Sequence, residues 1–302
     1  MAVGTIRMHG RDLRWNRNSL QVRKNRLLNP NGALMESSRR VLITGAGSGL
    51  GRALAFRYAE AGWRVACADI RVDRAEETVG LITGFGIGAM ALQVDVGSDE
   101  SFEALRDMVL AAWEGVDLVI NNAGVSGGGS VLTASMSDWH WMLNINLLGV
   151  VRGCRLFGPV LVEQGGGHIV NIASFAALAG GPGMATYATA KSGVVTVSEG
   201  LRADLEGSGV KISVVCPSFF QTNLLEGFRA PDNASLKMAT ALMREAKESA
   251  SDIAEAIYRS VERGEFLILP SAEVRNRWRL KRWFPELYFR KLMQLVRARG
   301  AR

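Results

Sequence analysis

The stretch "VLITGAGSGLGRALAF", residues 41–56, joins a short apolar run to a helix-forming segment through four glycines. Glycine permits positive φ angles and a close backbone approach, and the N-terminus of the following helix offers free N–H groups to a pyrophosphate. A strand before and a helix after are the context that a dinucleotide-binding turn requires; a tight packing turn is the alternative. Contacts with a dinucleotide are predicted at Gly45, Ser48, Gly49, Leu50 and Gly51.

Similar apolar runs follow along the chain and alternate with helix-length segments. They read "VLIT" at 41, "VACA" at 65, "ALQV" at 91, "LVIN" at 118, "HIVNIA" at 168, "KISVVC" at 211 and "FLIL" at 266. Alternating strands and helices indicate a parallel sheet, and continuous apolar runs are typical of strands covered on both faces. We predict an α/β fold of the Rossmann type: a doubly wound, seven-stranded parallel sheet with helices on both faces. The expected helices span residues 50–61, 73–81, 98–113, 136–163 and 187–206.

Asp69 ends the second predicted strand, 20 residues past Gly49. A carboxylate at this place can hydrogen-bond both ribose hydroxyls of an adenosine and repel a 2′-phosphate, which favours NAD over NADP. A solvated strand end is the alternative. Arg71 and Arg74 follow closely and could reach a phosphate, so NADP is not excluded.

The composition is that of a globular protein with a sizeable core, because hydrophobic residues make up 48% and charged residues 22% of the 302. No apolar run reaches the roughly 18 residues that span a bilayer, and residues 1–34 contain no signal-peptide core, so the chain is expected in the cytoplasm. Cys67, Cys154 and Cys216 lie in apolar stretches and are predicted to be reduced core residues. The three histidines are equally dispersed, so no catalytic metal is predicted.

In "SFAALAGGPGMATYATAK", residues 174–191, Tyr187 and Lys191 are four residues apart and project from one helix face, and Ser174 lies 13 residues upstream of the tyrosine. A tyrosine with its usual pKa of about 10 is a poor base at neutral pH, but a lysine ammonium one turn away favours the tyrosinate. The pair suits the removal of a hydroxyl proton during hydride transfer. A surface helix pair and a structural strand-end serine are the alternatives.

The motifs of the chain resemble, in order and spacing, those of the short-chain dehydrogenase/reductase family, in the branch with TGxxxGxG and YxxxK motifs. They are "TGAGSGLG" at 44–51, "NNAG" at 121–124, "NINLLG" at 144–149, Ser174, and "YATAK" at 187–191. The resemblance implies NAD(P)-dependent interconversion of an alcohol and its carbonyl, with Tyr187 as the base and Ser174 as the group that binds the substrate oxygen. It implies that Lys191 lowers the pKa of the tyrosine and that Asn146 supports a proton relay. A homodimer or homotetramer is also implied.

The resemblance extends to the cofactor. The implied contacts are Asp95 and Val96 at the adenine, Asn122 beside the adenine ribose, Tyr187 and Lys191 at the nicotinamide end, and Thr222 at the carboxamide.

The segment after Thr222 carries apolar side chains with helix-like spacing and few convergent charges. These are Leu224, Leu225, Phe228, Met238, Leu242 and Met243, and Phe175, Leu178 and Met184 could join them from the other side. Substrate loops of doubly wound sheets follow the carboxyl ends of the strands, so an apolar lid is predicted here. It suits secondary alcohols and ketones on a lipid-like, steroid-like or terpenoid frame. The alternative is that these side chains face the core or a second subunit.

Both ends of the chain are basic, although its middle is acidic. Residues 1–34 carry seven basic and one acidic side chain, and residues 275–302 carry ten and one. We expect a basic extension over 1–34, either a disordered arm or a misassigned translation start, a catalytic domain over 35–274, and a basic, aromatic, amphipathic helix over 275–302. Pro285 is expected to break this last segment and start a second helix.

The C-terminal segment allows three readings. A Trp- and Arg-rich amphipathic helix can lie on an anionic membrane, or its apolar face can pack on the enzyme body or on a second subunit. Nucleic acid is not expected, because neither tail carries a nucleic-acid motif. The functional alternative to an enzyme is a non-catalytic dinucleotide-binding sensor, or a membrane-associated adaptor, of the same fold.

Overall fold

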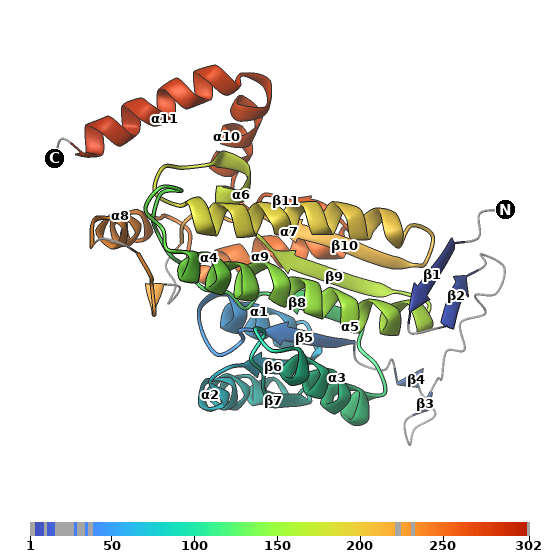
Figure 1. The fold of residues 1–302 in the computed structure, drawn as a ribbon. Coiled ribbons are helices and arrows are strands. Elements are labelled where there is room, and N and C mark those ends of the chain that lie inside the picture. The colour runs from blue at the N-terminus through green and yellow to red at the C-terminus, as the bar shows by residue number, and fades with distance from the viewer. Residues whose placement is uncertain are drawn as a thin grey trace.

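The computed structural model of the protein describes residues 4–8, 11–15, 27–28, 34–35, 39–220, 225–230 and 233–300. A parallel sheet of seven strands in the order β11-β10-β9-β8-β5-β6-β7 forms its centre (Figure 1). The strands are β5 (Arg40–Thr44), β6 (Arg64–Asp69), β7 (Ala89–Gln93), β8 (Leu118–Asn121), β9 (Gly167–Ile172), β10 (Val210–Val215) and β11 (Leu267–Ile268). All seven overlap the predicted apolar runs, and the reversal of strand order between β5 and β8 confirms the doubly wound topology.

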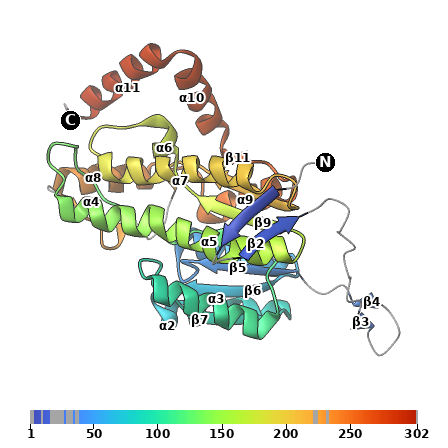
Figure 2. The same ribbon diagram turned by 45° about the vertical axis from the view of Figure 1, so that its right-hand side comes forward.

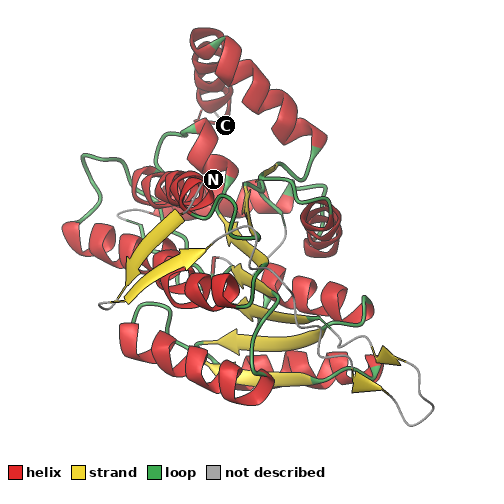
Figure 3. Cartoon of the chain, turned by 90° about the vertical axis from the view of Figure 1, so that its right-hand side faces the viewer, coloured by secondary structure: helices red, strands yellow, loops and turns green. Residues whose placement is uncertain are grey.

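The central strands such as β5 and β8 bury both of their faces, because successive side chains of a strand point to opposite sides, whereas the edge strand β7 is only partly buried. In β5, Val41 and Ile43 belong to one hydrophobic core and Leu42 belongs to the other. The first core is covered by α1 (Gly49–Glu60), α2 (Val72–Ile82) and α9 (Ala250–Glu262). The second is covered by α3 (Asp99–Trp113), α5 (Gly149–Glu163) and α7 (Ala185–Asp204). Helices thus lie on both sides of the sheet (Figure 3). The three cysteines are buried and unpaired, as predicted.

The helix predicted over residues 136–163 has three parts. It consists of α4 (Met136–Leu143), a π-helical turn η2 (Asn144–Leu148), and α5. By length and hydropathy it is the one helix in the described part of the chain that could cross a membrane. It is a core helix of this fold, because Val150, Phe157 and Leu161 belong to the second hydrophobic core.

Four short strands precede the large sheet. They are β1 (Gly4–Met8), β2 (Arg11–Trp15), β3 (Leu27–Leu28) and β4 (Leu34–Met35), and they pair as β1 with β2 and β3 with β4, both antiparallel. Neither pair joins the seven-stranded sheet. The division of the chain at residues 34 and 274 stays a prediction.

The C-terminal segment folds as two helices, α10 (Ala272–Trp283) and α11 (Pro285–Gly300). Pro285 is the first residue of α11, which confirms the predicted break. Val274 anchors α10 with 1% of its surface exposed, and the Lys281 ammonium donates a hydrogen bond to the Leu178 carbonyl in α6 (Phe175–Ala179). From this anchor, α11 turns back over the side of the molecule where α8 (Asn233–Arg244) lies (Figures 1 and 2).

Candidate active site

A cavity of about 580 Å³ lies among the segments that follow strands β5 to β10. This is where doubly wound sheets bind their ligands. The predicted site residues that line it are Gly45, Ser48, Leu50, Gly51, Asp69, Asp95, Val96, Asn122, Ser174, Tyr187 and Lys191. Gly49 lies in the same turn without lining the cavity, Asn146 lies behind the wall, and Thr222 lies outside the described residues.

The glycine-rich turn closes tightly at the start of α1. Gly45 has a φ of 66°, and a Cβ atom at Gly51 would lie 2.0 Å from the Gly45 carbonyl oxygen, so no larger residue fits there without rearrangement. The Asn122 side chain, at the end of the neighbouring strand β8, donates a hydrogen bond of 2.8 Å to the Thr44 carbonyl and so fixes the turn. The first amides of α1 have no acceptor within the helix, and the Ser48 side chain does not cap them. The turn therefore fits an anionic group at the helix N-terminus.

Asp69 is buried at the end of β6 with 9% of its surface exposed. Its two carboxylate oxygens accept hydrogen bonds from the backbone amides of Gly47 at 2.8 Å and Arg71 at 3.0 Å. These two bonds fix the carboxylate at the cavity wall. A carboxylate held in this way suits a ribose diol and repels a phosphate.

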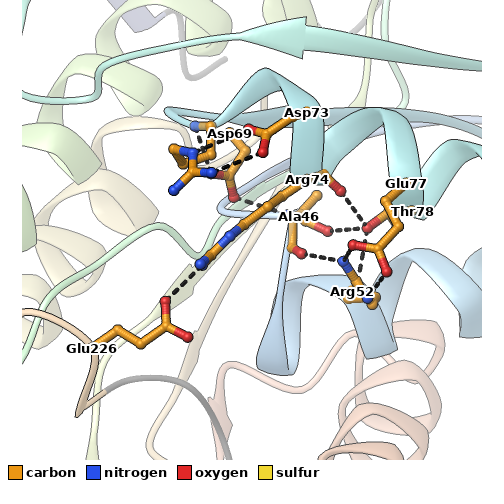
Figure 4. Close-up of polar contacts among 10 residues, drawn as sticks. Ala46, Arg52, Asp69, Asp73, Arg74, Glu77, Thr78 and Glu226 are labelled. Carbon is orange, nitrogen blue, oxygen red and sulfur yellow. Dashed lines mark hydrogen bonds and ion pairs between the residues drawn. The ribbon is translucent and has the colours of Figure 1, made fainter.

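The two arginines after β6 are engaged with acidic partners. Arg71 forms an ion pair with Asp73 at 2.8 Å. Arg74 reaches Glu226 at 2.7 Å (Figure 4). Arg74 thereby connects α2 to the loop after β10, which belongs to the substrate side. Binding of a 2′-phosphate by either arginine would compete with an existing pair.

Asp95 and Val96 lie on the loop after β7. The Asp95 carboxylate accepts a hydrogen bond of 2.8 Å from the Gly97 amide, and Val96 is buried against Gly149 of α5. A Cβ atom at Gly149 would lie 3.2 Å from the Val96 side chain, so the helix approaches this loop closely. The loop presents one acidic and one apolar side chain to the cavity.

Ser174, Tyr187 and Lys191 lie together on the opposite wall. Ser174 is the N-cap of α6, and its hydroxyl oxygen accepts a hydrogen bond of 3.1 Å from the Ala176 amide. Tyr187 and Lys191 lie on α7 with 7% and 4% of their surfaces exposed. The Lys191 ammonium donates to the Ile172 carbonyl at 2.8 Å, which ties α7 to the end of β9.

Burial has the largest effect on the pKa values of Tyr187 and Lys191. It raises the pKa of Tyr187, and a hydrogen bond with the Ser174 side chain acts in the opposite direction. Burial also lowers the pKa of Lys191 to about 8. The protein alone therefore keeps Tyr187 protonated at neutral pH, and further positive charge in the cavity would be needed to favour the tyrosinate.

Asn146 lies within the π-helical turn and is fully buried. Its side chain accepts a hydrogen bond of 2.9 Å from the Val125 amide and donates one of 2.8 Å to the Val125 carbonyl. A Cβ atom at Gly124 would lie 2.7 Å from the Asn146 side-chain oxygen and 3.5 Å from the Lys191 ammonium. Asn146 thus fixes the loop that passes directly beside Lys191.

The substrate side of the cavity is mainly apolar. Of the predicted lid residues, Leu225, Phe228, Leu242, Met243, Phe175 and Met184 line it. Leu178 does not, because its side chain packs against the second hydrophobic core. Leu224 and the side chain of Met238 lie outside the described part of the chain.

Helices α10 and α11 contribute to the cavity, which the sequence did not predict. The lining residues from these helices are Arg277, Tyr288, Leu292, Leu295 and Val296. The amphipathic pattern indicated an apolar face on α11 but not the surface that this face meets.

A glycine-rich turn at the head of a doubly wound parallel sheet defines the class of dinucleotide-binding α/β folds. Within that class, a family model described as short chain dehydrogenase matches residues 39–233. The chain therefore belongs to the short-chain dehydrogenase/reductase family, a family of oxidoreductases, as its motifs predicted.

Two curated relatives illustrate the family. "Probable oxidoreductase EphD" of Mycobacterium tuberculosis is 39% identical over 194 residues, 63% of this chain and 33% of that protein. The matched region thus spans about a third of that relative's length. "1-deoxy-11-beta-hydroxypentalenate dehydrogenase" of Streptomyces exfoliatus is 32% identical over 245 residues, 80% of this chain and 86% of that protein.

Solved structures share the fold. A short-chain dehydrogenase/reductase from Burkholderia phymatum in complex with NAD superposes with a TM-score of 0.77 and 32% identity over 83% of this chain and 95% of that one. A short-chain dehydrogenase from Sphingobium yanoikuyae in complex with NADPH gives 0.69 and 25% over 80% and 91%. Relatives of this fold thus bind either nicotinamide dinucleotide.

Proposed function

We propose that the protein is an NAD-dependent dehydrogenase or ketoreductase that interconverts an apolar secondary alcohol and its carbonyl, with Tyr187 as the base. The observation that carries the proposal is that Ser174, Tyr187 and Lys191 line one cavity together with the glycine-rich turn and Asp69. A site for a dinucleotide and a group able to take a hydroxyl proton thus share one space.

The cofactor would be held along the strand ends. The free amides at the start of α1 would bind the pyrophosphate, and Asp69 would bind the adenosine ribose. Asp95 and Val96 would contact the adenine, and Asn122 would lie beside the adenine ribose. Thr222 is proposed for the carboxamide. When bound, the oxidised nicotinamide supplies a hydride acceptor and a positive charge.

Ser174 and Tyr187 would act on the substrate oxygen. The Ser174 oxygen accepts a bond from the Ala176 amide, and its hydroxyl, which hydrogen-bonds with Tyr187, would donate its proton to the substrate oxygen once the substrate is bound. Tyr187, as tyrosinate, would take the proton from the alcohol oxygen while the carbon that bears this oxygen loses the hydride, and would return the proton in the reverse reaction. The serine stabilises negative charge that develops on the oxygen.

Lys191 and Asn146 would support the tyrosine. One ammonium proton of Lys191 is bound by the Ile172 carbonyl, which leaves two for the nicotinamide ribose and a water. Its positive charge favours the tyrosinate. Asn146 is a positioning residue, because it fixes the loop at Gly124 and Val125 beside the lysine.

Tyr187→Phe tests the assignment. Turnover of a secondary alcohol with NAD should fall at least about a thousandfold, because the general base is removed, while NADH binding persists. Tyr258→Phe in α9, which packs on the other face of the sheet, is the matched control and should keep its rate. An unchanged rate in Tyr187→Phe would exclude Tyr187 as the base, whereas NADH binding without turnover in the wild type would favour the alternative of a non-catalytic dinucleotide sensor.

An apolar substrate is supported by the side chains of the substrate end. Leu225, Phe228, Leu242 and Met243 line it, and its charged residues Glu226 and Arg277 are each ion-paired, with Arg74 and Glu273. A relative named for a hydroxypentalenate supports the same reading.

We also propose that the protein is a cytoplasmic homodimer or homotetramer whose C-terminal helices contact anionic membranes. Trp283, Phe284 and Phe289 are 73%, 60% and 56% exposed, and we name these three the aromatic patch. They lie within a segment of ten basic and one acidic residues. Exposed aromatic rings beside basic side chains suit the interface of an anionic bilayer.

Sedimentation with vesicles tests the membrane contact. The protein should sediment with phosphatidylglycerol vesicles and not with phosphatidylcholine vesicles. Replacement of the aromatic patch by serine should abolish this, whereas Leu132→Ser, at an exposed residue of the α4 loop, should not. Equal sedimentation of both variants would contradict the proposal, and a change of oligomeric state in the patch variant alone would assign the patch to a second subunit.

A further inference from the structure

The inner face of α11 belongs to the same cavity as the catalytic tyrosine. Tyr288, Leu292, Leu295 and Val296 line the cavity that also contains Ser174 and Tyr187. Their spacing of four, three and one residues places them on one side of the helix. The apolar face, for which the sequence left the enzyme body, a second subunit and a membrane open as partners, is therefore directed toward the substrate side of the enzyme body.

The facing side chains are apolar as well. Leu225 and Phe228 of the loop after β10, and Ala239, Leu242 and Met243 of α8, line the same cavity. These two apolar surfaces are covered only in part, because Met243 is buried but Leu295 remains 57% exposed and Leu292 is only partly buried. The groove between α11 and α8 thus offers apolar surface that an apolar molecule could cover.

Helix α10 holds this groove next to the catalytic serine. Lys281 donates to the Leu178 carbonyl in α6, and α6 begins directly after Ser174. The Arg275 guanidinium donates a bond of 2.8 Å to the Leu269 carbonyl after β11, which fixes the first turn of α10. The groove is therefore continuous with the reaction site and not a separate surface.

We propose that α11 forms the outer wall of the substrate site, and that the enzyme selects secondary alcohols or ketones with a long apolar chain, which extends from Ser174 and Tyr187 into the groove between α11 and α8. This inference rests on the proposed function and deepens it. Arg277, the charged residue that α10 contributes to the lining, is paired with Glu273, so the chain needs no anionic end.

A homologous series of alcohols tests the wall. With NAD and without vesicles, kcat/KM for 2-butanol, 2-hexanol, 2-octanol and 2-decanol should rise by up to about fourfold for each added methylene that the groove buries. Leu292→Asp should flatten this rise and lower kcat/KM for 2-decanol at least tenfold more than for 2-butanol. Gln294→Asp puts the same charge on the exposed side of α11, outside the cavity lining, and should keep the wild-type rise.

The outcomes separate the two proposals. A wild-type series that is flat, or a rise that survives Leu292→Asp, would overturn the wall. If no alcohol is turned over, the proposed function fails. Calorimetric titration of the NADH-bound protein with 2-decanone then tests independently whether α11 forms the outer wall of an apolar binding site. Binding that Leu292→Asp weakens at least tenfold and Gln294→Asp does not would support it, and absence of binding to the wild type would overturn it.

Discussion

The two ends of the cavity are built in different ways. At the cofactor end, the Asp69 carboxylate and the Asn122 amide are tied to the backbone of neighbouring strands and turns by bonds of 2.8 to 3.0 Å. At the substrate end, the walls are surface helices, and side chains such as Leu295 stay more than half exposed. A rigid end suits a ligand of fixed shape, and a loosely covered end suits variation in substrate.

The largest effect on NADH binding is expected at Gly51, because its substitution would disrupt the rigid end of the cavity. A Cβ atom there would lie 2.0 Å from the Gly45 carbonyl oxygen, so Gly51→Ala must displace the turn. NADH affinity should fall at least about a hundredfold, which corresponds to about 2.7 kcal/mol. Fluorescence titration with NADH measures it.

Gly80→Ala is the matched control. A Cβ atom at Gly80, in α2, would meet nothing within 4 Å. NADH affinity should stay unchanged, and the free energy of unfolding should rise by about 0.5 to 1 kcal/mol, because alanine is the better helix former. Equal NADH affinity in both variants would contradict the tight turn.

The next prediction concerns the pH dependence of stability, which arises in the β-sheet beneath both ends of the cavity. His168 on β9 is buried and its Nε2 lies 2.8 Å from the Ser213 hydroxyl, which donates to the Glu265 carbonyl at 2.6 Å. Since that hydroxyl proton is used, the Nε2–H group of His168 is the donor in its bond with Ser213. Burial, with a smaller contribution from Lys211, lowers the pKa of His168 to about 4.

Between pH 6.5 and pH 4 the unfolded chain binds more protons at this histidine than the folded chain does. The free energy of unfolding should therefore fall by up to about 3 kcal/mol as the pH drops through this window. His168→Gln keeps a donor without the titration and should remove that part of the slope, as denaturant unfolding at pH 4.5, 5.5 and 6.5 will measure. His140→Gln, at an exposed histidine, should keep the slope; a slope that persists in His168→Gln would exclude the buried ring as its source.

The same contrast separates what the sequence could predict from what it could not. The strand positions and the glycine-rich turn can be predicted from local sequence patterns. A short apolar run between turn-forming residues is too short for a helix and is best buried as a strand of a sheet. The π-helical turn at Asn146 interrupts a pattern that reads as one helix. Leu292 lies beside the cavity because β11 and α10 set the direction in which α11 runs. Helical spacing predicts that α11 has an apolar face, but it does not predict which surface that face contacts.

The smallest effect concerns cofactor choice at the rigid end. Asp69→Ala removes the charge that would repel a 2′-phosphate and the acceptor for a ribose, so the ratio of kcat/KM for NAD over NADP should fall about ten- to a hundredfold. The ratio should not invert fully, because Arg71 and Arg74 remain paired with Asp73 and Glu226.

Asp107→Ala, at an exposed residue of α3 that pairs with Arg106, is the control and should leave the ratio unchanged. A ratio that stays constant in Asp69→Ala would mean that the carboxylate only braces the turn through the Gly47 and Arg71 amides. In that case the variant should lose affinity for both cofactors equally, which the two separate titrations would show.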